Sequence, residues 1–257
     1  MKLAIRFAPA LALLAIAACA TAPKGPPALA AGDYAAILAD PGRPEADRKD
    51  DEARKPAEVL AFAGVHPGDT ILEMEAGRGW YSDILSSAVG PAGKLIIQYP
   101  AEFAYGTPAL KARTDAGRLK NATITITHFD KLEAADGSVD KVLWILGPHE
   151  IYYTPKDSTG LGDPRKTYAE IMRVLKPGGE FIAMDHAANA GDPTTTGATV
   201  HRIDPASVLA SAKAAGLVFV DRSDVLANPT DDRSKMVFDA TIRRHTDQFL
   251  FRFRKPA

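Results

Sequence analysis

Apolar residues follow two recurring patterns along this chain. Short, uninterrupted apolar runs such as TILEME (70–75) and KLIIQY (94–99) are typical of strands buried on both faces. The longer segment GWYSDILSSAV (79–89) has apolar residues at helical spacing and is followed by GPAG, which ends a helix. By the same criteria, strands are predicted at 122–127, 139–146, 180–186, 217–226 and 246–255, and helices at 33–40, 45–63, 108–119, 165–175 and 204–216.

The order of these elements predicts the fold class. Strands alternate with helices, which implies parallel βαβ units and an α/β fold with helices on both faces of the sheet. We therefore expect a Rossmann-like, doubly wound, mostly parallel seven-stranded sheet with an antiparallel edge strand, because no helix separates the last two strands. Ligands of such sheets bind beyond the carboxyl ends of the strands, so the loops after residues 75, 99, 127, 146 and 187 should meet at the binding site.

The first residues have the features of an export signal. Lys2 and Arg6 precede an apolar run over residues 7–18 that is too short to span a bilayer as a helix. Small residues followed by Cys19 resemble a bacterial lipobox, although an ordinary secretory signal with a chance cysteine is the alternative. We predict a lipoprotein signal peptide at 1–18, a lipidated Cys19 and a Pro-rich flexible tether at 19–32, and a globular domain at 33–257.

Composition narrows the expected partners. The chain has 257 residues, 46% of them hydrophobic, and a net charge of -1, which fits one sizeable domain and provides no basic field for nucleic acid. Cys19 is the only cysteine and cannot form an internal disulfide. The lipid on Cys19 would anchor the protein to the membrane. Because Ala20 and not aspartate follows the cysteine, we expect the bacterial envelope, at the periplasmic face of the outer membrane.

The segment ILEMEAGRG (71–79) carries the main functional motif. Gly77 and Gly79 lie between the first predicted strand of the alternating series and the helix that follows at once. Glycines at such a turn let the backbone approach a ligand closely. The motif is short and weak by itself, and its position after the first strand is what makes it a candidate ligand site.

Several segments resemble class I S-adenosylmethionine-dependent methyltransferases. ILEMEAGRG resembles their first motif, ADGSVDKVLWIL their fourth-strand motif, and AEIMRVLKPGGEFIAMDH their helix, turn and fifth strand. More narrowly, GWYSDIL, VHRIDP and KMVFDATIRRHTDQFLFRFRKP resemble a family of bacterial predicted methyltransferases that are often exported. The resemblance covers about residues 33–256. It implies S-adenosyl-L-methionine as the cofactor and an unidentified small molecule as the methyl acceptor.

The resemblance also implies roles for individual residues. Glu73 stands at the acid that ends the first strand, Gly77 and Gly79 at two glycines of the loop, and Asp130 at the acid that reads adenine. The implied cofactor-binding residues are Glu73, Glu75, Ala76, Gly77, Gly79, Tyr99 and Asp130.

Two positions depart from the pattern of the superfamily. Glu75 replaces the first glycine of the loop. Tyr99, or Gln98, replaces the acid that usually bonds the ribose hydroxyls, for which Glu102 is a nearby substitute.

Histidines provide the candidates for chemistry. His149 and His186 follow the fourth and fifth strands and are the predicted catalytic residues, each a candidate general base for a substrate hydroxyl or amine. The alternative for each is a structural histidine bonded to loop backbone. His201 either covers the mouth of the pocket or, with Asp204, caps the next helix. Tyr152 and Tyr153, with the polar loop after them, are candidates for a substrate lid.

Other site classes receive little support. DHAANAGD (185–192) contains ligand-type residues but no tight metal-binding pattern, so no metal site is predicted. No serine lies in a Gly-x-Ser-x-Gly elbow, which disfavours a hydrolase. The predicted export conflicts with a cofactor that is made in the cytoplasm. A non-catalytic ligand-binding or envelope-associated lipoprotein on a methyltransferase scaffold therefore remains the alternative function.

Overall fold

The computed structural model describes residues 27–257. The predicted signal peptide, Cys19 and most of the predicted tether lie outside the described residues. The backbone N–H of Leu29 donates to the carbonyl of Val65, and a 3-10 turn, η1, follows at Ala31–Asp33. Within the described residues no helix has the length and apolar character needed to cross a membrane.

The described residues form one seven-stranded sheet in the order β3-β2-β1-β4-β5-β7-β6. Neighbouring strands are parallel except that β7 is antiparallel to both β5 and β6. The predicted doubly wound sheet is therefore confirmed, with β7 inserted beside the edge strand β6. The strands are β1 (Thr70–Met74), β2 (Lys94–Tyr99), β3 (Ala122–Ile126), β4 (Val139–Ile145), β5 (Leu175–His186), β6 (Val218–Ser223) and β7 (Gln248–Arg254).

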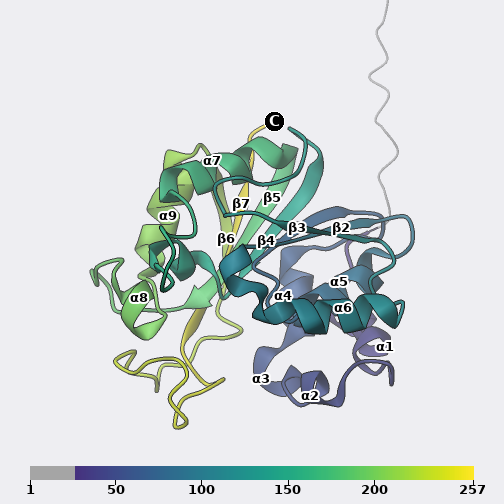
Figure 1. Ribbon diagram of the computed structural model, residues 1–257, viewed down its shortest axis with the longest axis horizontal. Helices are drawn as coiled ribbons and strands as arrows, with labels where there is room; N and C mark the ends of the chain where they lie inside the picture. The colour runs from purple at the N-terminus through teal and green to yellow at the C-terminus, as the bar shows by residue number, and fades with distance from the viewer. Residues whose placement is uncertain (1–26) are drawn as a thin grey trace, which may run out of the picture.

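Helices cover both faces of the sheet. Figure 1 shows α7 and α9 on one face, and α4, α5 and α6 on the other. Alternate residues of each strand enter the two cores: Leu72 and Met74 of β1 pack on the α7 side, and Ile71 packs on the α5 side. The helices are α1 (Tyr34–Leu38), α2 (Glu45–Arg48), α3 (Asp51–Arg54), α4 (Pro56–Ala63), α5 (Trp80–Val89), α6 (Thr107–Asp115), α7 (Pro164–Val174), α8 (Thr196–Val200) and α9 (Pro205–Ala214).

The prediction of one continuous helix over residues 45–63 is wrong. Residues 45–63 form three helices, α2, α3 and α4, instead of one. Lys55 has φ 44°, a left-handed conformation that ends a helix, and Pro56 begins the next helix at the position where its missing N–H costs nothing. The polar run therefore folds back over the carboxyl edge of the sheet instead of continuing as one long solvated helix.

Short elements at the carboxyl edge were not predicted from the periodicity. They are the 3-10 segments η2 (Ala101–Gly106) and η3 (Pro148–Tyr152), and α8. Each follows a strand or a loop that leads into the carboxyl edge, where α8 and the long β6–β7 loop also lie (Figure 1). The backbone N–H of Val237 in that loop donates to the carbonyl of Val200 at the end of α8. These elements surround the place where parallel α/β sheets bind ligands.

Candidate functional site

A strained loop connects β1 with α5. Glu75, Gly77 and Gly79 have φ angles of 55°, 53° and 78°, in the left-handed region that glycine adopts without steric cost. Glu75 thus has the backbone conformation of a glycine although it carries a large side chain. A non-glycine residue held in this way costs on the order of 1 kcal/mol and is found mainly at functional sites.

A buried ion network supports this loop from the side of α6. The Nε of Arg113 donates to the carbonyl of Arg78, and its guanidinium pairs with Asp83 at 2.7 Å and Asp47 at 2.6 Å. Asp83 is fully buried and also pairs with Arg118 at 2.6 Å. Because each buried charge has a partner, the network holds the back of the loop in one position.

The front of the loop opens on a cavity of about 350 Å³. Its volume lies near the lower end of the range of small-molecule sites. Glu73, at the end of β1, accepts a hydrogen bond from Ser82 Oγ at 2.5 Å, and burial raises its pKa to about 7. The walls come from the loop, from α2, α3 and α5, and from the end of β4: Asp47, Asp50, Arg54, Glu73, Met74, Glu75, Ala76, Gly77, Arg78, Trp80, Tyr81, Tyr105, Ile145, Leu146 and Arg243.

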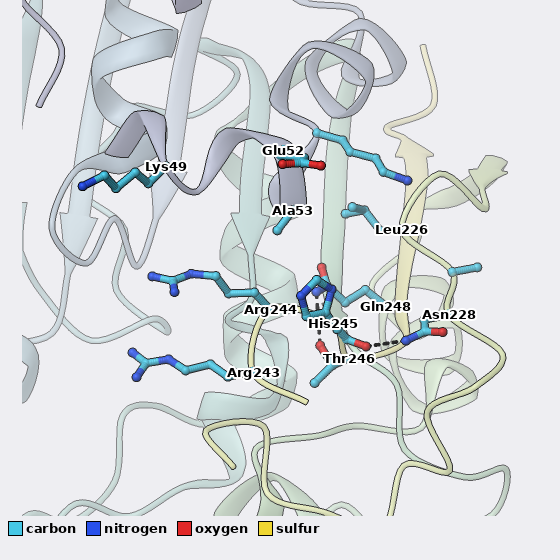
Figure 2. A pocket seen from close by; sticks show the side chains of 12 residues that line it. Lys49, Glu52, Ala53, Leu226, Asn228, Arg243, Arg244, His245, Thr246 and Gln248 are labelled. Carbon is cyan, nitrogen blue, oxygen red and sulfur yellow. Dashed lines mark hydrogen bonds between the residues drawn. The ribbon is translucent and has the colours of Figure 1, made fainter. Parts of the chain in front are cut away.

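A smaller cavity of about 120 Å³ shares Arg54, Tyr81, Leu146 and Arg243 with the first cavity. Met184 and His186 of β5 form part of its wall, together with the apolar Val237 and Phe238 of the β6–β7 loop. A wider hollow of about 660 Å³ adjoins it through Arg243, Arg244 and Gln248, and Figure 2 shows this hollow with Arg243, Arg244, His245, Lys49 and Glu52 around it. The three spaces are neighbours along the carboxyl edge, because the smallest shares lining residues with each of the other two.

The carboxyl ends of β2 and β3 are covered by the chain itself. We call residues 153–163 the cover loop. The backbone N–H of Phe129 donates to the carbonyl of Leu161, which is fully buried, and Asp130 accepts a hydrogen bond from the backbone of Asp163. Glu102 accepts from Ser158 Oγ at 2.8 Å and lies 3.1 Å from His128 Nε2.

The residues expected to hold the ribose also form hydrogen bonds within the chain. The hydroxyl of Tyr99 lies 2.9 Å from Thr107 Oγ1, and the Gln98 amide donates to the carbonyl of Thr127. Gly106 of η2 packs so closely on the glycine loop that a Cβ atom there would lie 1.9 Å from the carbonyl oxygen of Gly77. In this half of the edge, Tyr99 and Asp130 therefore bond to neighbouring segments of the chain.

A cluster of buried histidine and carboxylate side chains lies beyond β4 and β5. Both oxygens of Asp185 contact His149 Nδ1, at 2.9 and 3.0 Å, and one also accepts the backbone N–H of His149. His149 Nε2 lies 3.1 Å from His201 Nδ1 and 3.2 Å from Glu150 Oε1. Burial disfavours the imidazolium, but the carboxylates of Asp185 and Glu150 outweigh it and raise the pKa of His149 to about 10.

Two further buried groups border this cluster. The carboxylate of Glu75 reaches from the glycine loop to Gly147, beside the indole nitrogen of Trp144. Burial, and then the neighbouring Glu150, raise the pKa of Glu75 well above its ordinary value. His186 has a different environment: its Nδ1 lies 2.7 Å from Thr246 Oγ1, and burial, followed by His149, lowers its pKa.

Known proteins provide an independent comparison. The chain matches no protein-family model. It is 28% identical over 129 residues to a ubiquinone/menaquinone biosynthesis C-methyltransferase from Hydrogenovibrio crunogenus, covering 49% of this chain and 46% of that protein. It is 24% identical over 210 residues to an arsenite methyltransferase from Halobacterium salinarum, covering 77% of this chain and 49% of that protein. The chain thus spans about half the length of these curated relatives.

Solved structures agree on the architecture. An S-adenosylmethionine-dependent methyltransferase from Aquifex aeolicus superposes with a TM-score of 0.57 at 21% identity, over 83% of this chain and 98% of that one. A geranyl diphosphate methyltransferase in complex with S-adenosylmethionine gives 0.58 at 17% identity, over 86% and 94%. The chain has the class I methyltransferase fold. The predicted resemblance to that superfamily is confirmed, and the narrower resemblance to an exported family stays a prediction.

Within the methyltransferase fold, the residues predicted to bind the cofactor separate into three groups. Glu73, Glu75, Ala76 and Gly77 line the cavity in front of the glycine loop. Gly79 lies at the back of the loop, where a Cβ atom would meet the Leu110 side chain at 2.6 Å. Tyr99 and Asp130 lie outside the cavity and bond to neighbouring segments of the chain.

The two predicted catalytic histidines also differ in position. His186 lines the smaller cavity, and His149 is buried in the cluster with Asp185. Glu150, Asp185 and the contact between His201 and His149 were not predicted. His201 lies 52 residues from His149 in the sequence. The only signal for their contact was that His149 follows β4 and His201 follows the next strand, β5. Asp204 caps α9, as one alternative predicted, by accepting the backbone N–H of Ala206.

Proposed function

We propose that this protein is a class I methyltransferase that transfers a methyl group from S-adenosyl-L-methionine to a small molecule. One observation carries the proposal: a glycine-type loop with three positive φ angles opens on a cavity at the carboxyl ends of β1 and β4. The relatives and structural neighbours, which are methyltransferases, support the same reading. No feature of the described residues selects one acceptor.

The residues of the cavity in front of the glycine loop suit the amino-acid half of the cofactor. When bound, S-adenosylmethionine supplies a methyl group attached to positively charged sulfur. Glu73 and Glu75 would lie near the positive charges of the cofactor, which favour the carboxylate form of both side chains, and Arg54, Arg78 and Arg243 would face the carboxylate of the cofactor. Ile145 and Leu146 at the end of β4 would then lie beside the methyl group and exclude water from it.

The smaller cavity suits the methyl acceptor. It adjoins the cavity in front of the glycine loop through Tyr81 and Leu146, and its wall contains His186. A lowered pKa keeps this imidazole neutral near neutral pH, so it can accept a proton from an acceptor hydroxyl or amine as the new bond to carbon forms. His186 is therefore the better placed of the two predicted bases.

The adenosine half of the cofactor requires a change at the cover loop. Asp130, the residue expected to read adenine, accepts a hydrogen bond from the backbone of Asp163. We propose that the cover loop moves away from β3 when the cofactor binds, which releases Asp130 and Glu102 for the ligand. The free energy of opening would reduce the apparent affinity for the cofactor.

Calorimetric titration of the purified full-length protein with S-adenosylmethionine and S-adenosylhomocysteine tests the proposal. We expect dissociation constants in the micromolar range and weaker binding by Asp130→Ala. A folded protein that gives neither heat nor thermal stabilisation with either ligand would contradict the proposal and favour a non-catalytic role on the same scaffold. Binding that appears only in Glu75→Gly would identify a disabled site instead.

We also propose that the chain is a lipid-anchored protein of the bacterial envelope. Support comes only from the sequence of the first residues, which lie outside the described part of the structure: a positive start, an apolar run and Cys19 after small residues. Incorporation of a labelled fatty acid into the wild type and not into Cys19→Ser is the expected result. Equal labelling of both proteins, or of neither, would contradict it.

A further inference from the structure

Three potential metal-ligating atoms converge beyond the ends of β4 and β5. His149 Nε2, His201 Nδ1 and Glu150 Oε1 are separated from one another by 3.1, 3.2 and 3.5 Å. A tetrahedral zinc ion with ligands at about 2.0–2.2 Å places neighbouring ligand atoms about 3.3 Å apart. The three atoms therefore already have the separations of one face of such a tetrahedron.

Asp185 orients the first of these ligands. It is fully buried, and both of its oxygens contact Nδ1 of His149. Its carboxylate thus accepts the Nδ1–H, and the lone pair of Nε2 is directed at His201 and Glu150. A carboxylate that holds the outer nitrogen of a histidine ligand is the usual second layer of a metal site, and it fixes both tautomer and ring orientation.

The backbone places the other two ligands with little freedom. Glu150 lies in η3, directly after β4, and its backbone N–H donates to the carbonyl of Gly147. His201 has φ 54° at the end of α8, a left-handed conformation that is uncommon for residues other than glycine. A strained backbone that aims a side chain into a buried cluster points to a role for that side chain.

The buried carboxylates of the cluster suit a bound cation. Glu150 and Asp185 bring two buried carboxylates to His149 and His201. Glu150 Oε2 is buried and has no hydrogen-bond partner among the described residues. Buried carboxylates without partners are costly, and a bound divalent cation would neutralise two negative charges at once.

We propose that His149, Glu150 and His201 bind one divalent transition-metal ion, with Asp185 as the outer partner of His149. Two imidazoles and one carboxylate suit Zn²⁺ and the related ions Co²⁺, Fe²⁺ and Mn²⁺ more than Ca²⁺ or Mg²⁺, which prefer oxygen ligands. Three protein ligands leave a fourth position for water or for an electron-pair donor of a small molecule.

A proton is the competing occupant of this cluster. An imidazolium at His149 would donate from Nε2 to Glu150 or His201, but a single N–H cannot make two good hydrogen bonds at once. A metal ion satisfies all three lone pairs together. A chelator distinguishes the two occupants, because it removes a metal ion but leaves a proton-held cluster unchanged.

Metal binding to the purified full-length protein tests the proposal without any cofactor. The protein is stripped with a chelator, dialysed and titrated with Zn²⁺ against a chromophoric competitor, and the bound metal is counted by mass spectrometry. We expect one Zn²⁺ per chain, a higher Tm with the metal, and a Co²⁺ form with the intense visible absorption of four-coordinate cobalt.

Three variants and a control locate the ion. His201→Ala and Glu150→Gln should each weaken Zn²⁺ binding about 100-fold or more, and Asp185→Asn about 10–100-fold. His66→Ala is the matched control, because His66 is also paired with a carboxylate, Asp69 at 3.5 Å, but is 40% exposed and far from the cluster in the sheet. Circular dichroism checks that the variants fold. Glu150→Gln preserves the size of the side chain and remains informative if His201→Ala does not fold.

The outcomes separate this proposal from the proposed methyltransferase function. Stoichiometric binding that both ligand variants lose supports the site, whatever the result with S-adenosylmethionine. Absence of retained Zn²⁺ and of stabilisation in the folded wild type would overturn it in favour of a proton-held cluster. Equal Zn²⁺ affinity in wild type, His201→Ala and Glu150→Gln would also overturn it, because the ion would then bind elsewhere.

Discussion

The two halves of the carboxyl edge of the sheet differ in what satisfies their polar groups. Beyond β1, β4 and β5, ionisable side chains such as Glu73, Glu75 and His186 face cavities. Beyond β2 and β3, side chains of similar chemistry, Asp130 and Glu102, bond to the cover loop. Both halves lie at the same edge of one sheet, so the difference arises from the segments that follow the strands.

One half thus presents polar side chains to cavities, whereas those of the other half already have partners within the chain. In the open half, a ligand meets polar groups that have few bonds to lose. In the covered half, every bond to a ligand replaces a bond within the chain, which reduces the net gain. The affinity of such a site for a ligand should therefore depend strongly on the glycine loop of the open half and weakly on single hydrogen bonds of the cover loop.

The largest expected effect comes from removing the support of the open half. Arg113→Met leaves the buried Asp83 with one partner fewer and releases the carbonyl of Arg78. We expect a loss of about 3 kcal/mol in the free energy of unfolding and a Tm lower by roughly 6–12 °C. Lys111→Met on the same helix removes only an exposed pair with Asp115 and should cost less than about 0.5 kcal/mol. Similar costs for both variants would show that the network gives the loop no special support.

The next effect concerns close approach of the ligand to the glycine loop. Gly77→Ala adds a methyl group that meets no protein atom within 4 Å but points into the space in front of the loop, at φ 53°. We expect about 10–100-fold weaker binding of S-adenosylmethionine in calorimetry, with a loss of stability of about 1 kcal/mol. Gly137→Ala has φ 59° and equal space at the opposite edge. It should lose the same stability and keep its affinity, and equal affinities in both variants would place the ligand elsewhere.

The next prediction concerns the contribution of Glu73 to the pH dependence of stability. Burial raises its pKa from 4.5 to about 7, so between these values the folded protein holds a proton that the unfolded chain releases. The stability contributed by Glu73 is therefore present at low pH and lost as the pH rises through 7. Glu73→Gln should reduce the fall in Tm between pH 5 and pH 8 by roughly 5–10 °C. Glu58→Gln, at an exposed position, should leave the fall unchanged, and an equal response of both variants would contradict this account of Glu73.

The smallest effect concerns the covered half. Ser158→Ala removes the hydrogen bond from the cover loop to Glu102, which lowers the cost of opening the loop. We expect S-adenosylmethionine to bind about two- to five-fold more tightly, as measured by calorimetry. Ser138→Ala removes a local bond to the carbonyl of Ala135 at the other edge and serves as the control. Weaker binding by Ser158→Ala would instead mean that the ligand contacts the closed loop.

Much of the fold could be predicted from the sequence because periodicity reports burial on a local scale. TILEME and KLIIQY became β1 and β2 with bounds that differ by at most one residue. The prediction was wrong across residues 45–63, where the charged run suits a helix at every position. Only the left-handed conformation of Lys55, in the context of the packed sheet edge, breaks that helix into three.

The candidate site could be predicted only in part. The glycine loop was found because its residues are contiguous and carry their own conformational preference. The cavity it faces also contains Arg54 and Arg243, which come from segments almost 190 residues apart and have no local signature. The cover loop was predicted as a lid, but its bond to Asp130 depends on where β3 ends relative to α7.

Local residue patterns are sufficient to predict the order of strands and helices, the position of the glycine-type loop and the histidines that follow β4 and β5. These features depend on residues close together in the chain, whose spacing decides which face is buried. The tertiary structure alone decided that His149, Glu150 and His201 converge on one point, and that Asp130 is covered. Those contacts arise because parallel strands bring distant loops to one edge, and their distances depend on how the whole sheet packs.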